Sequence, residues 1–335
     1  MRIVIFIVTL LLVNNFSWAQ SVIPLYEQKG LSFRGLSAVN DSIIWVSGSK
    51  GTVGKSLDGG KSWTWHPVPG YENRDFRDIE AFDDKRAVII AIDTPAQILY
   101  TEDGGLNWKL SMNDSRAGMF LDALHFENDV HGFVIGDPVN GQFFLAETKD
   151  GGISWQDLSG KILQKPDSVE AFFAASGTNI IIEKTDIFAV SGGLKSFLHF
   201  NAQKYPLPLL SGSGNTGANG MILHDGKFYI VGGDFTRPND TTGNFVIVKL
   251  AATPEYTLPQ SAPGGYRSGI AHFRNNEFIT CGMNGVDWSG NGGIHWKQIS
   301  TTGYHTIMKA KKGTTVFMAG GNGRIAKFSP ETVTR

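Results

Sequence analysis

The chain has 335 residues, of which 41% are hydrophobic and 18% charged, and its formal net charge is −1 at pH 7. This is the composition of a globular protein. The near-zero net charge argues against nucleic-acid binding, but it does not exclude a local charged patch on the surface. The 41 glycines and an aromatic fraction of 11% favour an all-β protein with many tight turns.

The first predicted element is a secretory signal peptide over residues 1–19. Arg2 supplies a positive start, residues 3–13 form an apolar run, and Ser17 and Ala19 are small residues where a signal peptidase reads the chain. The run is too short for a permanent transmembrane helix, and no later segment reaches spanning length. We expect a mature chain that begins near Gln20, forms one domain over residues 20–335 and is periplasmic or extracellular.

A turn motif then repeats along the chain. Residues 56–63, 101–108 and 148–155 match Ser/Thr-x-Asp-x-Gly-x-x-Trp, and residues 289–296 are a degenerate copy with Asn for Asp. In such a turn the Asp binds nearby amides, the Gly takes a positive φ and the Trp starts the next strand. The motif is identified as the Asp-box, or BNR repeat, and a structural role is expected for its residues. They are Asp58, Asp103, Asp150, Asn291, Trp63, Trp108, Trp155 and Trp296.

The spacing of these motifs predicts the number of repeats. The first three Trp residues stand 45 and 47 residues apart, and the fourth follows after 141, which is three times 47. A second pattern, an aromatic or apolar residue before an alternating strand, begins near residues 33, 76, 120, 169, 218, 266 and 304. Four strands in each unit of about 40–50 residues are typical of a propeller blade. We predict a seven-bladed β-propeller of four-stranded antiparallel blades, closed by residues 22–28 of the mature N-terminus.

These patterns together resemble the photosystem II stability/assembly factor-like BNR propellers. The resemblance rests on Phe-Arg-x-x-x-Ala-Val at residues 33–39, on residues 48–53 and on the Asp-Gly-Gly-x-x-Trp turns, and it covers most of the mature chain. Residues 136–143, 171–179 and 231–235 look like stretches of bacterial members, which are often labelled glycosyl hydrolase or oxidoreductase. The resemblance implies a seven-bladed fold and, in photosynthetic members, a non-catalytic role in assembling a membrane-protein complex. Nothing in this sequence indicates photosynthesis.

The variable residue at the start of each first strand is the main candidate for function. First strands line the channel of a propeller, so three arginines and a histidine at one mouth would form an anion-binding ring. Arginine clusters are also part of what the resemblance implies. Asp78, Asp122 and Glu170 stand nearby and are expected to pair with some of the arginines, so channel salt bridges without a ligand are an alternative. The predicted ligand-binding residues are Arg34, Arg77, Glu170, Arg267 and His305, with Asn219 as a further candidate.

The sequence therefore predicts a non-enzymatic binding or assembly-factor-like propeller whose partner is a protein segment or an anionic ligand. A glycoside hydrolase is the alternative, because sialidases also carry Asp-boxes. The Phe-Arg segments lack the Pro of the sialidase Phe/Tyr-Arg-Ile-Pro motif. A glycosidase needs two carboxyl groups, and no spacing singles out a pair among the candidates Asp122, Asp137, Glu170 and Asp234.

No cofactor or metal is predicted. Cys281 is the only cysteine, which excludes an intrachain disulfide and a cysteine-built zinc site. His125 and His131 have no third ligand nearby in the sequence, and no Gly-rich loop follows a strand and opens a helix.

Overall fold

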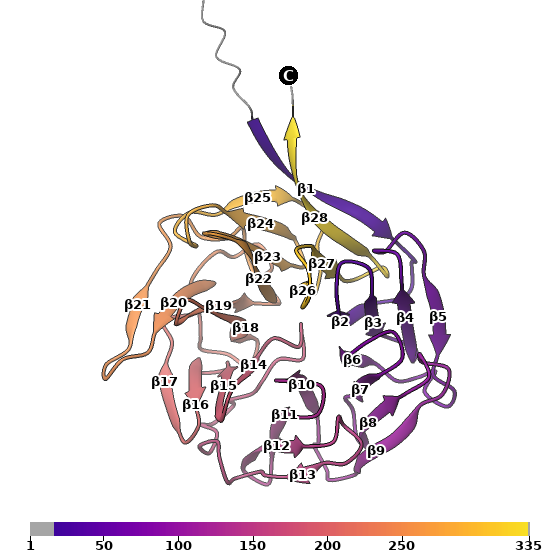
Figure 1. Cartoon of the computed structure of the whole chain (residues 1–335). Helices are drawn as coiled ribbons and strands as arrows, with labels where there is room; N and C mark the ends of the chain where they lie inside the picture. Colours follow the sequence, from indigo (N-terminus) through magenta and orange to yellow (C-terminus); the bar gives the residue numbers. More distant parts are fainter. Residues whose placement is uncertain (1–16, 334–335) are drawn as a thin grey trace, which may run out of the picture.

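The computed structural model describes residues 17–333, and the regular structure in this range is entirely β-strand. The strands form seven antiparallel four-stranded sheets around a central channel (Figure 1). The first strands of neighbouring blades contact one another all the way round the ring, so these strands line the channel. The prediction of an all-β, seven-bladed propeller is confirmed. Within the described residues there is no helix that could cross a membrane.

Blades 1 to 3 each use four consecutive strands. Blade 1 contains β2 (Phe33–Ala38), β3 (Ile44–Gly48), β4 (Thr52–Ser56) and β5 (Thr64–Pro67). Blade 2 contains β6 (Phe76–Ala81), β7 (Ala87–Ala91), β8 (Ala96–Thr101) and β9 (Lys109–Asp114). Blade 3 contains β10 (Leu121–Phe126), β11 (Gly132–Val139), β12 (Gln142–Thr148) and β13 (Gln156–Asp157).

Blades 4 to 6 follow the same order. Blade 4 contains β14 (Ile180–Glu183), β15 (Asp186–Ser191), β16 (Phe197–Phe200) and β17 (Gln203–Pro206). Blade 5 contains β18 (Thr216–His224), β19 (Lys227–Asp234), β20 (Phe245–Lys249) and β21 (Glu255–Thr257). Blade 6 contains β22 (Gly269–Arg274), β23 (Glu277–Gly282), β24 (Gly285–Ser289) and β25 (Lys297–Ser300).

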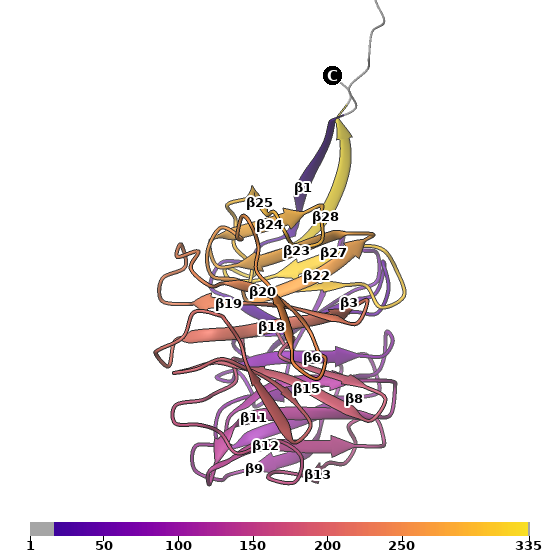
Figure 2. The ribbon, with the colours of Figure 1, turned by 90° about the vertical axis from the view of Figure 1, so that its left-hand side faces the viewer.

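Blade 7 combines the two ends of the described chain. Its strands are β26 (Thr306–Lys309), β27 (Val316–Ala319), β28 (Ile325–Val333) and β1 (Ser17–Tyr26), and Val22 lies opposite Phe328 in the antiparallel pair. Figure 2 shows β1 and β28 running out together from the rim of the ring. The predicted closure by the N-terminal strand is confirmed. Most of the predicted signal peptide, residues 1–16, lies outside the described residues, while residues 17–19 begin β1.

The hydrophobic core lies between the blades. Trp45 of blade 1 packs in one cluster with Phe76 and Ile89 of blade 2, and each of the three is fully buried. Because an interior strand is covered by a blade on either side, both of its faces are apolar, as in the uninterrupted run of β7. Similar clusters join the other neighbouring blades.

The four Asp/Asn-Gly-Gly turns join the third and fourth strands of blades 1, 2, 3 and 6. In the first, the Ser62 amide donates to Asp58 Oδ1 over 2.9 Å and the Gly60 amide donates to Ser56 Oγ over 2.8 Å, with Gly60 at a φ of 86°. The equivalent bonds form around Asp103, Asp150 and Asn291. Hydrogen bonds from Ser62 lower the pKa of Asp58 to about 2. These side chains are thus engaged within their own turns.

The predicted first strand of blade 4 is wrong in position. Residues 169–175 are irregular. Their one β-bridge to a sheet is between Ala171 and Gly192, and β14 begins at Ile180 instead. Residues 171–179, here called the channel segment, run through the channel. Ser176 Oγ donates to the Ser268 carbonyl over 2.7 Å, and Thr306 Oγ1 donates to the Ser176 carbonyl over 3.0 Å.

Candidate functional site

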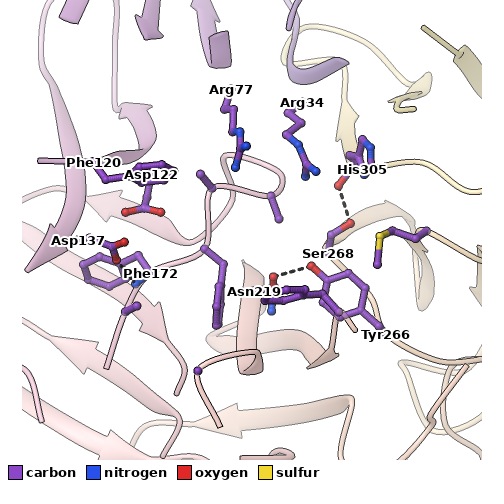
Figure 3. A pocket seen from close by; sticks show the side chains of 17 residues that line it. Arg34, Arg77, Phe120, Asp122, Asp137, Phe172, Asn219, Tyr266, Ser268 and His305 are labelled. Carbon is purple, nitrogen blue, oxygen red and sulfur yellow. Dashed lines mark hydrogen bonds between the residues drawn. The ribbon is translucent and has the colours of Figure 1, made fainter. Parts of the chain in front are cut away.

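A cavity of about 330 Å³ lies at the channel mouth where the first strands begin (Figure 3). Side chains from blades 1, 2, 3, 5, 6 and 7 face it, and the channel segment forms part of its wall. The residues used below as its lining are Arg34, Arg77, Phe120, Asp122, Asp137, Phe172, Asn219, Tyr266, Ser268 and His305. Of the residues proposed from the sequence as ligand-binding, Arg34, Arg77, Asn219 and His305 come together in this cavity.

Arg34 and Arg77 stand side by side on one wall of this cavity and point into it (Figure 3). Arg77 Nε pairs with Asp75 Oδ2 at 2.9 Å. Among the described residues, no carboxylate lies within ion-pair distance of Arg34, and no hydrogen bond from its guanidinium is present. Burial and the charge of Arg77 both lower the pKa of Arg34. Arg34 is therefore a partly buried cation whose charge lacks a partner.

His305 lies next to the two arginines, as predicted, but it does not add a positive charge. Burial lowers its pKa to about 3, and the charges of Arg34 and Arg77 act in the same direction. The ring is therefore neutral at physiological pH. Asn219 also lines the cavity, where its Oδ1 accepts a 2.7 Å hydrogen bond from the Tyr266 hydroxyl (Figure 3).

Asp122 and Asp137 face each other on an adjoining wall, on the Arg77 side of the cavity, and the Arg77 charge acts on Asp122 (Figure 3). Burial raises the pKa of Asp122 well above its usual value, and the charge of Asp137 adds to the shift. Burial likewise raises the pKa of Asp137 to about 6, although the Phe172 amide donates to its Oδ1 over 3.0 Å. Neither carboxyl group forms an ion pair with an arginine within residues 17–333.

Arg267 does not reach the cavity, which corrects its predicted place in the arginine ring. Its side chain is fully buried in blade 6, where it pairs with Asp287 and where its Nη1 donates to the Tyr266 carbonyl over 2.7 Å. Burial raises the pKa of Asp287, and the neighbouring guanidinium opposes that shift. Arg267 is thus a buried structural partner of one carboxylate.

Glu170 also lies outside the cavity, packed within blade 4. Its Oε1 accepts hydrogen bonds from Ser191 Oγ at 2.6 Å and from His199 Nε2 at 3.0 Å, and its Oε2 lies 3.0 Å from Lys204 Nζ. Burial alone would raise its pKa, but these bonds outweigh burial and hold the pKa at about 2. The predicted pairing of Glu170 with a channel arginine is therefore wrong, because its partners come from its own blade.

The remaining predicted carboxylates are also satisfied elsewhere. Asp78 accepts hydrogen bonds from the amides of Ile79 and Leu124, at 2.8 and 2.7 Å, and so links blade 2 to blade 3 in place of pairing with an arginine. Asp234 accepts a 2.8 Å bond from Arg237 Nε three residues along the chain. Of the four glycosidase candidates, only Asp122 and Asp137 meet in one cavity.

The comparisons with known proteins bear on the fold. No family model matches the chain, and no curated protein sequence is similar to it. The solved structure "YCF48 bound to D1 peptide" has a TM-score of 0.65 and 17% identity, over 94% of this chain and 97% of that one. YCF48 from Cyanidioschyzon merolae gives 0.65 and 16%, over 94% and 100%. The WD40 propeller domain of Doa1 gives 0.62 and 14%, over 94% and 98%.

At these identities the likeness establishes a shared propeller fold. The fold implied by the sequence resemblance is therefore present, and the YCF48 structures are among the chains that share it.

Several lining residues were not predicted from sequence. In the sequence pattern, Phe120 and Tyr266 are only the aromatic residues that open a strand, yet their side chains line the cavity. The strand pattern predicts Phe172 in the first strand of blade 4, but this residue lies in the channel segment. The repeated aromatic residue before the variable one was the signal that could have identified Phe120 and Tyr266.

A second cavity, of about 610 Å³, opens where the first strands end. Its wall is mostly apolar and includes Ile181, Met221 and Ile307, and the His224 and His272 rings stack in it with centroids 3.7 Å apart. The channel segment separates the two cavities: Ala171 to Ala175 face the first, whereas Gly177 and Thr178 face the second.

Proposed function

We propose that this chain is an exported, non-enzymatic propeller that binds a protein segment at the first cavity, with an acidic group of that segment held by Arg34 and Arg77. The observation that carries the proposal is Arg34, a partly buried guanidinium that faces a cavity and has no carboxylate partner in the described part of the chain. Buried charges are normally paired, and a guanidinium is suited to bind a carboxylate through two parallel hydrogen bonds.

Two further observations support a protein ligand. One of the solved structures with the same fold is described as bound to a peptide. The cavity also combines charged groups with the aromatic side chains Phe120, Phe172 and Tyr266, a mixture that suits a peptide carrying both polar and apolar side chains. Export is proposed from the signal-like residues 1–19, and it predicts an envelope or secreted protein whose N-terminus is near Gln20.

Capture of partners from the native envelope fraction tests the proposal. Substituting Arg34→Ala together with Arg77→Ala should reduce the captured amount of the specific partner at least about tenfold, equivalent to 1.4 kcal/mol. Thermal stability should change little, because loss of the partly exposed Arg77–Asp75 pair is offset by relief of the repulsion between the two guanidinium groups. Arg86→Ala with Arg237→Ala is the matched control, since it removes the same charge from exposed ion pairs outside the cavity.

Unchanged capture by the Arg34/Arg77 variant would refute the binding site. A collapse of its thermal stability would instead make the two arginines structural and remove the main support for the proposal.

Glycoside hydrolysis is a second candidate because of the Asp122–Asp137 pair. Burial raises the pKa of both groups, that of Asp137 to about 6, and two neighbouring carboxyl groups with shifted pKa values are suited to the roles of general acid and base. A screen of glycan substrates with the native chain and with Asp122→Asn tests this candidate. Hydrolysis that the substitution abolishes would establish it, and its absence from the native chain across the screen would count against it.

A further inference from the structure

The proposed binding of an acidic group leaves two buried carboxyl groups of the same cavity without a role. Asp122 is fully buried, and neither of its carboxyl oxygens has a hydrogen-bond partner among the described residues. The amides of Asp137 and Ala174 lie near enough to moderate its pKa, but neither forms a hydrogen bond of ordinary geometry with it. Because buried polar atoms are almost always hydrogen-bonded, this unpartnered carboxyl group at the cavity wall points to a missing donor.

The charge of the pair indicates what kind of donor is missing. Asp137, with a pKa of about 6, gives the pair a negative charge at pH 7.5, and burial and that charge raise the pKa of Asp122, while Arg77 opposes the shift. Neither oxygen of Asp122 accepts a hydrogen bond from the described residues, and Phe172 supplies a single N–H to Asp137. A group with one positive charge and several N–H donors, either an ammonium or a guanidinium, complements both properties.

The aromatic residues beside the carboxyl groups are also suited to a cation. Phe120 and Phe172 lie next to Asp122 and Asp137 (Figure 3). The Phe120 ring already receives the guanidinium carbon of Arg77 at 5.8 Å from its centroid. The faces of aromatic rings attract cations, and they do so more strongly where water is excluded.

We propose that Asp122 and Asp137 form a cation subsite that binds a primary ammonium or guanidinium group. The cavity would then hold a ligand with charges of both signs, namely a peptide segment in which a Lys or Arg side chain stands near an acidic group. This inference rests on the proposed function for the acidic end of the ligand. The separate places of Arg34 and of the two aspartates in the cavity set the orientation in which such a segment binds (Figure 3).

Peptide binding to the whole chain tests the subsite. The probes are capped, fluorescent octapeptides in which one Lys and one Glu stand one to four residues apart, with matched peptides in which Gln replaces the Lys, the Glu or both. At pH 7.5 the best Lys–Glu peptide should bind the native chain at least tenfold more tightly than its Glu-only counterpart. Asp122→Asn with Asp137→Asn should abolish that preference while the Glu-only peptide still binds. Asp234→Asn, a buried aspartate outside the cavity, is the control.

The outcomes separate this inference from the proposed function. Equal binding of Lys–Glu and Glu-only peptides by the native chain would overturn the subsite and leave the arginine site standing. A preference that survives the double substitution would do the same. If none of the peptides binds, both proposals fail.

A measurement on the unaltered chain covers the case in which the double variant does not fold. Lowering the pH from 7.5 to 5.5 should reduce the preference for Lys–Glu peptides severalfold, because Asp137, with a pKa of about 6, takes up a proton and loses its negative charge. The other charged or titratable groups that face the cavity are Arg34, Arg77, Tyr266 and His305. Over this range the arginines stay charged, Tyr266 stays protonated and His305 stays neutral. A preference that does not change with pH would overturn the subsite.

Discussion

Arg34 and Arg267 look equivalent in the sequence but occupy different places in the folded repeat. Each follows an aromatic residue at the start of a first strand, and the sequence pattern treats them alike. The Arg267 amide donates to the Gly232 carbonyl of the preceding blade, as the Phe33 amide donates to that of Gly320, so Arg267 takes the place of Phe33. Arg267 is fully buried because Asp287, twenty residues further along in β24, lies beside it. Arg34 has no such partner and faces the cavity. The spacing of the residues does not show this one-residue difference, which buries one guanidinium beside a carboxylate and leaves the other at the cavity.

Removing the Arg267 side chain should therefore destabilise the fold strongly. Arg267→Ala leaves the buried Asp287 without its counterion, a change that typically costs about 3–5 kcal/mol. Arg77→Ala breaks a pair whose side chains are 30% and 25% exposed and should cost less than about 1 kcal/mol. Urea denaturation of both variants measures the difference. Equal losses of stability would show that burial does not distinguish the two pairs.

The candidate carboxylates are a second case in which residue spacing does not identify the site. The sequence yielded four candidates for a catalytic pair without a preference among them, and the structure brings only Asp122 and Asp137 together. Asp137 comes from β11 and Asp122 from β10, which pair as neighbours with an irregularity in register at this point. The same shift in register occurs at Arg34, Arg77 and Asn219, and residue spacing alone does not show it.

At the scale of elements, the strand pattern predicted six of the seven first strands correctly and failed in blade 4. Residues 169–175 contain two adjacent phenylalanines and two adjacent alanines, so they lack the alternation of a strand. Gly177 follows with a φ of 70°, and a Cβ added there would lie 2.4 Å from Asp78 Oδ1. Close packing inside the channel, which the sequence alone does not show, explains why this segment is irregular.

The ring-closing strand β1 is the element whose loss should be most damaging. It pairs with β28 along its length, and the Tyr26 ring also packs against that of Trp65 in blade 1, with centroids 4.7 Å apart. It therefore joins blade 7 to blade 1 and covers a sheet edge that would otherwise be open. A chain that starts at Glu27 should lose at least about 5 °C in its apparent Tm and should self-associate.

Thermal unfolding and size-exclusion chromatography check this prediction, with a chain that starts at Gln20 as the control. If the shorter chain is as stable and as monomeric as the control, then β1 is not needed to close the ring.

At the scale of the whole molecule, the propeller presents two different cavities at the two ends of one channel. The first carries two arginines and two aspartates, whereas the second is larger and mostly apolar. The channel segment lies between them and is bonded to blades 6 and 7 through Ser268 and Thr306. The Asp/Asn-Gly-Gly turns, which identify the fold in the sequence, lie between the third and fourth strands and take no part in either cavity.

The most direct test of the central claim is an experimental structure of the chain in complex with the tightest-binding octapeptide. We predict that the peptide lies in the first cavity, with its acidic group against Arg34 and Arg77 and its basic group against Asp122 and Asp137. A peptide seated in the second cavity, or along the outer edge of a blade, would contradict it.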